Sequence, residues 1–118
     1  MFRWHQYRLN QSARFNIPTE PGVYVLIENQ IVNGLPLNNR ALYVGKTENL
    51  RRRFNDYSNP QKVHNELVGE RIMNNQVEFW YTKVSSHDLD RVERLFIHDF
   101  NTPMNKIKYK EYNRDRSD

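Results

Sequence analysis

The chain has 118 residues, of which 37% are hydrophobic, and it carries a formal net charge of +4 at neutral pH. This is the length of one domain with one core, and no apolar run approaches the roughly 20 residues of a membrane-spanning helix. The chain contains no cysteine, which excludes disulfides and thiolate metal sites and agrees with a reducing, cytoplasmic compartment.

The basic character of the chain points to a polyanionic partner, most simply nucleic acid. Of its 18 cationic residues, 12 are arginine, whose planar guanidinium suits bidentate phosphate contacts better than lysine does. We therefore expect a single domain, residues 1–118, that binds nucleic acid and has no membrane partner. A homodimer or an accessory protein is an open expectation.

The first elements in chain order are an arm and two strands. Residues 1–17 are mixed in composition, predict a short helix or an extended arm, and lack the apolar stretch of a signal peptide. Residues 22–27, GVYVLI, predict a largely buried strand. Residues 28–40 are rich in Asn, Gly and Pro and predict a hairpin connection. Residues 41–44 predict the returning strand, which Gly45 ends.

Helices dominate the second half of the chain. Thr47 is the expected N-cap of a helix over residues 48–57. A second helix is expected over residues 61–73, an alternating half-buried strand over 76–83 and a third helix over 87–100. The order β-β-α-α-β-α predicts an α+β domain with a small, three-stranded antiparallel sheet flanked by helices.

The third predicted helix carries a carboxylate in an unusual place. At 100° per residue, Val92, Phe96 and Phe100 gather around Leu89, and Glu93 falls inside this apolar stripe. An ionised carboxylate there is costly unless it is paired or binds a metal. Three interpretations remain open for Glu93: an ion pair with a buried arginine, a side chain that bends to solvent, or a metal ligand.

The first predicted helix carries three consecutive arginines. Arg51, Arg52 and Arg53 point in three directions and cannot form one cluster. Arg53 shares a helix face with Tyr57 and lies near the buried side. Arg51 and Arg52 are expected to face solvent or a phosphate backbone.

Two tyrosines, Tyr24 and Tyr43, lie on strands that should pair with each other. Strand tyrosines normally pack in a core with the hydroxyl at its rim. A phenol, a guanidinium and a carboxylate together resemble a hydrolytic phosphodiester site. The carboxylate can hold a divalent metal, the arginine can stabilise negative charge on phosphate, and the phenol can orient or deprotonate water.

The motifs, taken in order, resemble the GIY-YIG nuclease domain. They are GVY at 22–24, YVG at 43–45, then K-T-x-N-L-x-x-R, E-x-x-x-I and P-x-N. The ordered set is far more specific than any one short motif. The resemblance covers a core of about residues 20–106, leaves the arm 1–17 and a basic tail 107–118 outside it, and implies a GIY-YIG endonuclease-like fold.

The resemblance also implies a role for individual residues. Tyr24 and Tyr43 match the tyrosines that position or activate the attacking water, and Arg53 matches the catalytic arginine. Glu93 matches the single carboxylate that binds Mg²⁺ or Mn²⁺. Three further matches are a position filled by tyrosine or histidine, a lysine that faces phosphate and an asparagine that closes the site: Tyr57, Lys46 and Asn105.

The function implied by the resemblance is metal-dependent hydrolysis of DNA phosphodiester bonds. One alternative is a non-catalytic basic module that binds nucleic acid on the same scaffold. A third is a structural or assembly protein that uses the sheet as an interaction surface. The connection between the two tyrosine motifs is longer than is typical of the family, with an insertion around 29–39 that is either a substrate-contacting loop or a longer turn.

Overall fold

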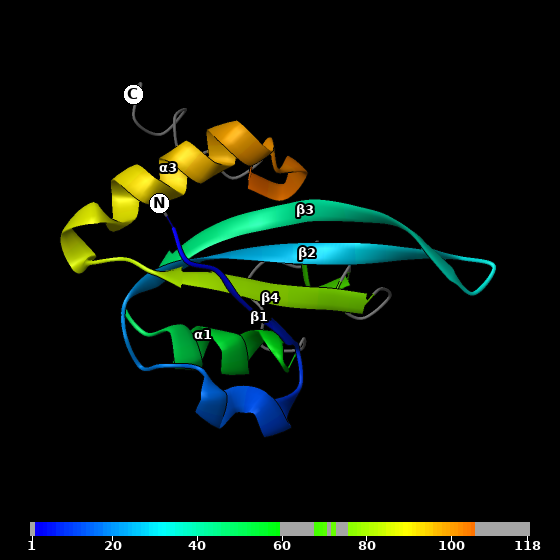
Figure 1. Cartoon of the computed structure of the whole chain (residues 1–118), viewed down its shortest axis with the longest axis horizontal. Coiled ribbons are helices and arrows are strands. Elements are labelled where there is room, and N and C mark those ends of the chain that lie inside the picture. Colours follow the sequence, from blue (N-terminus) through cyan, green and yellow to red (C-terminus); the bar gives the residue numbers. More distant parts are fainter. Residues whose placement is uncertain (1, 60–67, 71, 73–75, 106–118) are drawn as a thin grey trace.

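A computed structural model of the chain describes residues 2–59, 68–70, 72 and 76–105 (Figure 1). Within these ranges the chain forms an α+β fold, as predicted, around a four-stranded antiparallel sheet of order β1-β4-β2-β3. The strands are β1 (His5–Arg8), β2 (Gly22–Val32), β3 (Leu35–Thr47) and β4 (Gln76–Lys83).

The sheet has one strand more than the three that were predicted, because β1 joins it at one edge. This strand pairs with β4 from His5↔Tyr81 to Arg8↔Glu78, and the Gln6 Nε2 atom donates a hydrogen bond to Glu78 Oε2 at 2.6 Å. The rest of the expected arm forms a short 3-10 helix, η1 (Gln11–Asn16). β1 has only four residues and its partner lies about 70 residues later, so no local pattern indicates it.

The hairpin predicted across residues 28–40 is present, but the connection itself is much shorter than predicted, because both strands continue through the segment. β2 runs to Val32 and β3 begins at Leu35, joined by a turn in which Asn33 and Gly34 both have positive φ, 52° and 82°. Such two-residue turns match the twist of a hairpin, and Asn-Gly is their preferred sequence. Asn is depleted in strands, which explains why composition indicated a loop.

Helices cover both faces of the sheet. Helix α1 (Leu50–Tyr57) lies on one face, and α3 (Leu89–Phe100), preceded by the 3-10 helix η3 (Ser86–Asp88), lies on the other (Figure 1). The two hydrophobic clusters reflect this arrangement. The α1-side cluster includes Tyr24, Leu26, Phe54 and Phe79, and the α3-side cluster consists of Val23, Val25, Val44, Leu89, Val92 and Phe96.

Helix α1 begins two residues later than predicted. Its N-cap is Asn49, whose Oδ1 accepts a hydrogen bond from the Arg52 backbone N at 3.0 Å. The predicted N-cap, Thr47, instead exchanges hydrogen bonds with the backbone of Asn49 at 3.0 and 3.1 Å. Asn is as good an N-cap as Thr or better, and Asn49 is the residue with extended backbone immediately before the first helical turn.

Two predicted segments fall largely or wholly outside the described residues. Of the helix expected over 61–73, residues 68–70 and 72 are described, and they are helical. The basic tail 107–118 lies outside the described part of the chain. In the part that is described, no helix is long and apolar enough to cross a membrane.

Candidate active site

Three of the predicted tyrosines gather on the α1 face of the sheet. Tyr24 comes from β2 and Tyr57 from α1, and their hydroxyl oxygens lie 3.0 Å apart. The ring of Tyr43, from β3, has its centroid 6.4 Å from that of Tyr24. All three side chains are buried, so their packing also contributes to the core.

A β-bulge directs Tyr43 towards this cluster. Leu26 pairs with Tyr43, but the next residue of β2, Ile27, pairs with Ala41, so Leu42 is an extra residue on β3. Leu42 and Tyr43 are consecutive, yet both belong to the α1-side cluster. A regular strand would place them on opposite faces, whereas a bulge re-aims one side chain.

Gly22 and Gly45, the glycines of the two motifs, are required because neighbouring atoms lie too close to them to allow a side chain. Gly45 pairs with Tyr24 across the strands, and a Cβ atom on Gly45 would overlap the Tyr24 ring and hydroxyl. A Cβ on Gly22 would lie 2.6 Å from both the Leu50 Cδ1 atom and the Thr82 carbonyl oxygen. The phenol of Tyr24 can therefore lie across β3 only because position 45 has no side chain.

The environment of the tyrosine pair favours the neutral phenol. Burial raises the pKa of Tyr24 well above its usual value near 10, and the nearby Tyr57 and Tyr43 add to this effect. Burial also raises the pKa of Tyr57. The Arg53 guanidinium lowers both pKa values but does not outweigh burial. Both hydroxyls are therefore protonated at neutral pH, and one donates its hydrogen to the other.

Arg53 lies on α1 beside the tyrosine pair and keeps part of its hydrogen-bonding capacity unused. Its Nη1 atom is 3.6 Å from the Asp56 carboxylate, a loose contact between partly exposed groups. Its Nε atom is buried and has no hydrogen-bond partner among the described residues. Buried donors without a partner are rare in native proteins, and an anion is the natural acceptor for a guanidinium.

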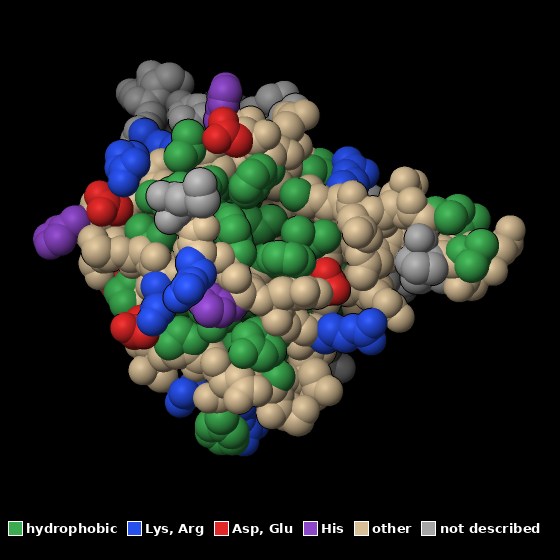
Figure 2. All heavy atoms as spheres, viewed as in Figure 1, with side chains coloured by type: hydrophobic (Ala, Val, Ile, Leu, Met, Phe, Trp, Pro, Cys, Tyr) green, Lys and Arg blue, Asp and Glu red, His purple; other side chains and the backbone are tan. Residues whose placement is uncertain are grey.

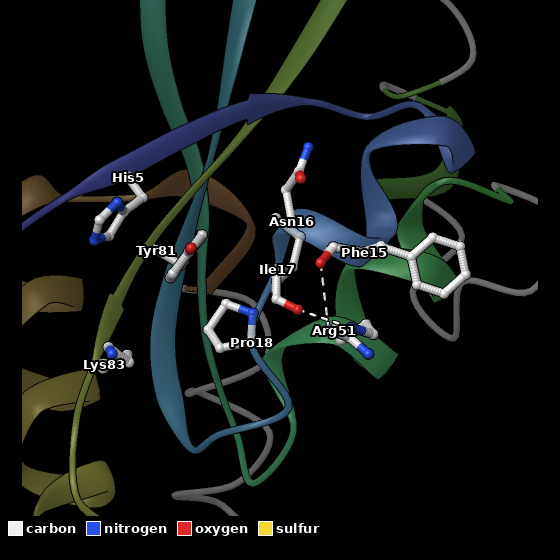
Figure 3. A pocket seen from close by; sticks show the side chains of 8 residues that line it. All are labelled: His5, Phe15, Asn16, Ile17, Pro18, Arg51, Tyr81 and Lys83. Atoms are coloured by element: carbon white, nitrogen blue, oxygen red, sulfur yellow. Dashed lines mark hydrogen bonds between the residues drawn. The ribbon is translucent and has the colours of Figure 1, made fainter.

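The neighbouring arginines differ from Arg53 and from each other. Arg51 is half-buried, and it donates from Nε to the Ile17 carbonyl at 2.8 Å and from Nη2 to the Phe15 carbonyl at 3.4 Å. It therefore fastens η1 to α1, contrary to the expected solvent or phosphate role. It also lines a pocket of about 260 Å³ with His5, Tyr81 and Lys83, among others (Figure 3). Arg52 is exposed, as predicted.

Glu93 lies in a different layer from the tyrosines. It is half-buried on α3, at the edge of the stripe whose buried members are Leu89, Val92 and Phe96. Lys46 of β3 pairs with Asp90, one helical turn before Glu93. Residues three apart share a helix face, so Glu93 projects on the side of α3 that meets β3.

Asn105 is held against the free edge of β3. Its Oδ1 accepts hydrogen bonds from the Val44 backbone N and from Thr102 Oγ1, both at 2.6 Å, and its Nδ2 donates to the Val44 carbonyl at 2.7 Å. The side chain is buried. The Asn105 side chain therefore makes the hydrogen bonds to Val44, the residue after Tyr43, that a further strand would otherwise make.

The structure thus brings together Tyr24, Tyr43, Tyr57 and Arg53, and it arranges Lys46, Glu93 and Asn105 around the other side of the same edge strand. Among the described residues, no group of three or more His, Asp or Glu side chains could hold a metal. A single carboxylate suits Mg²⁺, which keeps several waters and shares its ligands with substrate phosphates. Glu93 fits that kind of site.

One polar residue of this region was not predicted. Glu28 of β2 is fully buried, two residues after Leu26 and four after Tyr24. Strand alternation places all three on the same face. That alternation, carried past Ile27 into the segment interpreted as a loop, is the signal that would have identified a buried carboxylate beside the tyrosine cluster.

Comparison with known proteins agrees with this fold. The family model described as the GIY-YIG catalytic domain matches residues 20–111. The fold is similar to the GIY-YIG N-terminal endonuclease domain of UvrC from Thermotoga maritima bound to magnesium, with 19% identity, a TM-score of 0.55 and coverage of 80% of this chain and 92% of that one. A tyrosine-to-phenylalanine variant of that domain, bound to the catalytic divalent cation, is also similar, with 17% identity, a TM-score of 0.55 and coverage of 80% of this chain and 91% of that one. No curated protein matches in sequence.

Proposed function

This chain belongs to the GIY-YIG family, and we propose that it is a divalent-metal-dependent endonuclease that hydrolyses DNA phosphodiester bonds. Membership of the family implies a nuclease, and the net charge of +4 favours a polyanionic substrate. The similar domain from T. maritima is bound to magnesium, which supports Mg²⁺ or Mn²⁺ as the cation here.

The observation that carries the proposal is the state of Arg53. Its buried Nε lacks a hydrogen-bond partner among the described residues, and it lies beside two neutral phenols that share one hydrogen bond. A phosphate oxygen would satisfy the guanidinium and would lie next to hydroxyl groups able to orient water. A folded core has no need of this combination, whereas phosphodiester hydrolysis does.

In the proposed reaction, water attacks the phosphorus in line with the leaving oxygen. Tyr24 or Tyr43 orients this water and, in the phenolate form, accepts its proton, while Arg53 stabilises the negative charge that develops on the phosphate. Since burial raises the pKa of Tyr24, its phenolate would form only where the positive charge of Arg53 and of a bound divalent cation lowers that pKa. Glu93 would hold a divalent cation, which would supply Lewis-acid stabilisation of the phosphate and leaving group.

The test is nicking of supercoiled plasmid in Mg²⁺, Mn²⁺ or EDTA. We expect the wild type to cut only with metal and Glu93→Ala not to cut. Arg53→Ala should be slower by about 100-fold or more, as for other groups that stabilise transition-state charge. The matched control is Arg52→Ala on the same helix, which removes an exposed arginine of equal charge and should cut within a few-fold of the wild type.

Two results would overturn the proposal. Salt-sensitive DNA binding that survives Glu93→Ala, with no cutting of plasmid, branched or single-stranded DNA in any metal, would identify a binding module instead. Equal losses in Arg52→Ala and Arg53→Ala would show that general positive charge, and not the site, supports the activity.

A further inference from the structure

The far half of the β2–β3 hairpin extends beyond the rest of the sheet. Among the described residues, β4 pairs with β2 as far as Asn29↔Gln76, whereas β2 and β3 continue to pair to Val32↔Leu35. From here on, the arm means residues 30–38 of this hairpin and no longer the N-terminal residues 1–17. Within the described part of the chain, it forms a two-stranded ribbon that projects from the body (Figure 1). At about 3.3 Å per residue, the turn at Asn33 lies roughly 13 Å past Asn29.

The tip of the arm is apolar and exposed. Val32, Leu35 and Leu37 are 45%, 59% and 56% exposed, and hydrophobic side chains are visible at the far end of the ribbon in Figure 2. A two-stranded hairpin is at best marginally stable alone in water. Exposed apolar residues that gather in one place are typical of a surface that is covered when a partner binds.

The base of the arm carries amides and a positive charge. Gln30 and Asn38 face each other, with Asn38 Nδ2 donating to Gln30 Oε1 at 3.4 Å. Asn29 and Asn39 form the neighbouring cross-strand pair on the opposite face. Arg40 follows and is exposed. Residues 29–40 contain no acidic side chain, so the whole ribbon is compatible with a polyanion.

We propose that the arm enters the major groove of duplex DNA and reads sequence on one side of the cut. This rests on the proposed nuclease function. The major groove admits a two-stranded β-ribbon, Asn and Gln pair with adenine there, Arg pairs with guanine, and apolar side chains contact the thymine methyl. The deep, narrow major groove of duplex RNA does not admit such a ribbon.

The arm continues the strands that carry the active-site tyrosines, which sets its distance from the cut. Gln30 and Val32 lie six and eight residues after Tyr24 on one strand. At about 3.3 Å per residue these are separations of roughly 20 and 26 Å. Along B-form DNA, with about 3.4 Å per base pair, the arm would contact the groove about six to eight base pairs from the scissile phosphate.

The register of the hairpin allows a clean deletion. Gln30 and Asn38 are already cross-strand partners, so removing Ile31, Val32 and residues 35–37 leaves Gln30-Asn33-Gly34-Asn38. This sequence retains the Asn-Gly turn and the alignment of both strands. A milder variant, Gln30→Ala with Asn38→Ala, removes amides and keeps the length of the arm. Unchanged thermal unfolding would show that each variant is folded.

Binding is measured in the Glu93→Gln background, so that cutting does not interfere, with a 30-base-pair duplex DNA and a duplex RNA of equal length. We expect the deletion to weaken DNA affinity about tenfold or more and to remove footprint protection six to eight base pairs from the cut. The double alanine variant should relax sequence preference in that window. RNA affinity should not respond to either change.

Unchanged affinity and footprint after the deletion would overturn the proposal. So would a deletion that converts a dimer to a monomer without weakening DNA binding, because the arm would then contact a second copy of this chain. An arm-dependent footprint in a protein that never cuts would refute the nuclease function alone. Cutting without an arm-dependent footprint would refute the arm alone.

Discussion

The Tyr24 phenol depends on a single missing methyl group. Its ring stacks on Phe79, with centroids 5.1 Å apart, meets Tyr57 edge-on at 5.5 Å, and lies over Gly45. With neighbours on several sides, the ring has little room to move when one contact tightens. The Tyr24 hydroxyl, in the first motif, can therefore occupy its position only because residue 45, in the second motif, is glycine.

We predict that Gly45→Ala lowers the free energy of unfolding by about 1–3 kcal/mol, the usual cost of overpacking. It should also slow plasmid nicking, because the Tyr24 ring must shift. Urea denaturation and nicking rates measure the two effects. In a Tyr24→Leu background the added methyl should cost much less; an equal cost there would show that the strain arises elsewhere.

The tyrosine pair also predicts alkaline instability. Because burial raises the pKa of Tyr24 and Tyr57 in the folded state, folding retains their protons more tightly than the unfolded chain does. Their contribution is fully present below pH about 10, the unfolded pKa, and is lost as the pH rises towards the folded-state values. The unfolding free energy should fall by up to about 1.4 kcal/mol per pH unit for each tyrosine. Urea titrations between pH 9 and 11 measure this slope, which Tyr57→Phe should reduce; an unchanged slope contradicts the assignment.

The Asn105 side chain makes hydrogen bonds to the backbone of β3 at Val44. Asn105→Ala would leave the buried N and O atoms of Val44 without partners, at about 1–3 kcal/mol for each unsatisfied group. We predict lower stability and faster hydrogen exchange at the Val44 amide, measured by NMR. Thr102→Val is the matched comparison, since it removes only the third hydrogen bond to Asn105 and should leave the Val44 amide protected. Equal exchange in both variants would contradict this role.

At the scale of elements, the sequence indicated most of the sheet and the helices α1 and α3, because β2 begins with a continuous apolar run, and apolar residues alternate in β4 and recur with helical period in α3. The family resemblance named Tyr24, Tyr43, Arg53 and Tyr57 as members of one site, and the structure places them on one side of the sheet, while their roles stay predictions. The sequence patterns did not indicate the segments that are stabilised mainly by backbone hydrogen bonds between strands. β1 has little apolar content of its own, and the arm is a strand pair in spite of its asparagines, because Asn33-Gly34 closes the ladder.

Other details of the site depend on three-dimensional context alone. The buried Nε of Arg53 and the contacts that Arg51 makes with the Phe15 and Ile17 carbonyls follow from how η1 packs on α1. Helical spacing separated Arg53 from Arg51 and Arg52, but only the fold distinguishes Arg51 from Arg52. The same is true of the bulge at Leu42, which shifts the face of Tyr43 without any unusual residue.

For the whole molecule, we predict that metal controls activity and not folding. The expected site supplies one carboxylate, whereas metals that hold a fold together contribute on the order of 10 kcal/mol through several ligands. Replacing Mg²⁺ with EDTA should abolish nicking and shift the melting temperature by less than about 1 °C. Thermal unfolding with and without metal tests this, and a fall of several degrees would indicate a structural ion within the protein.

The pairing of β1 with β4 has a consequence for synthesis on the ribosome. Residues His5–Arg8 leave the ribosome early, but their partners at Glu78–Tyr81 follow about 70 residues later. At about 5–20 residues per second, β1 waits roughly 4–14 s for a neighbour. The helix and hairpin between them can form first from local contacts, so the strand made first completes the sheet last.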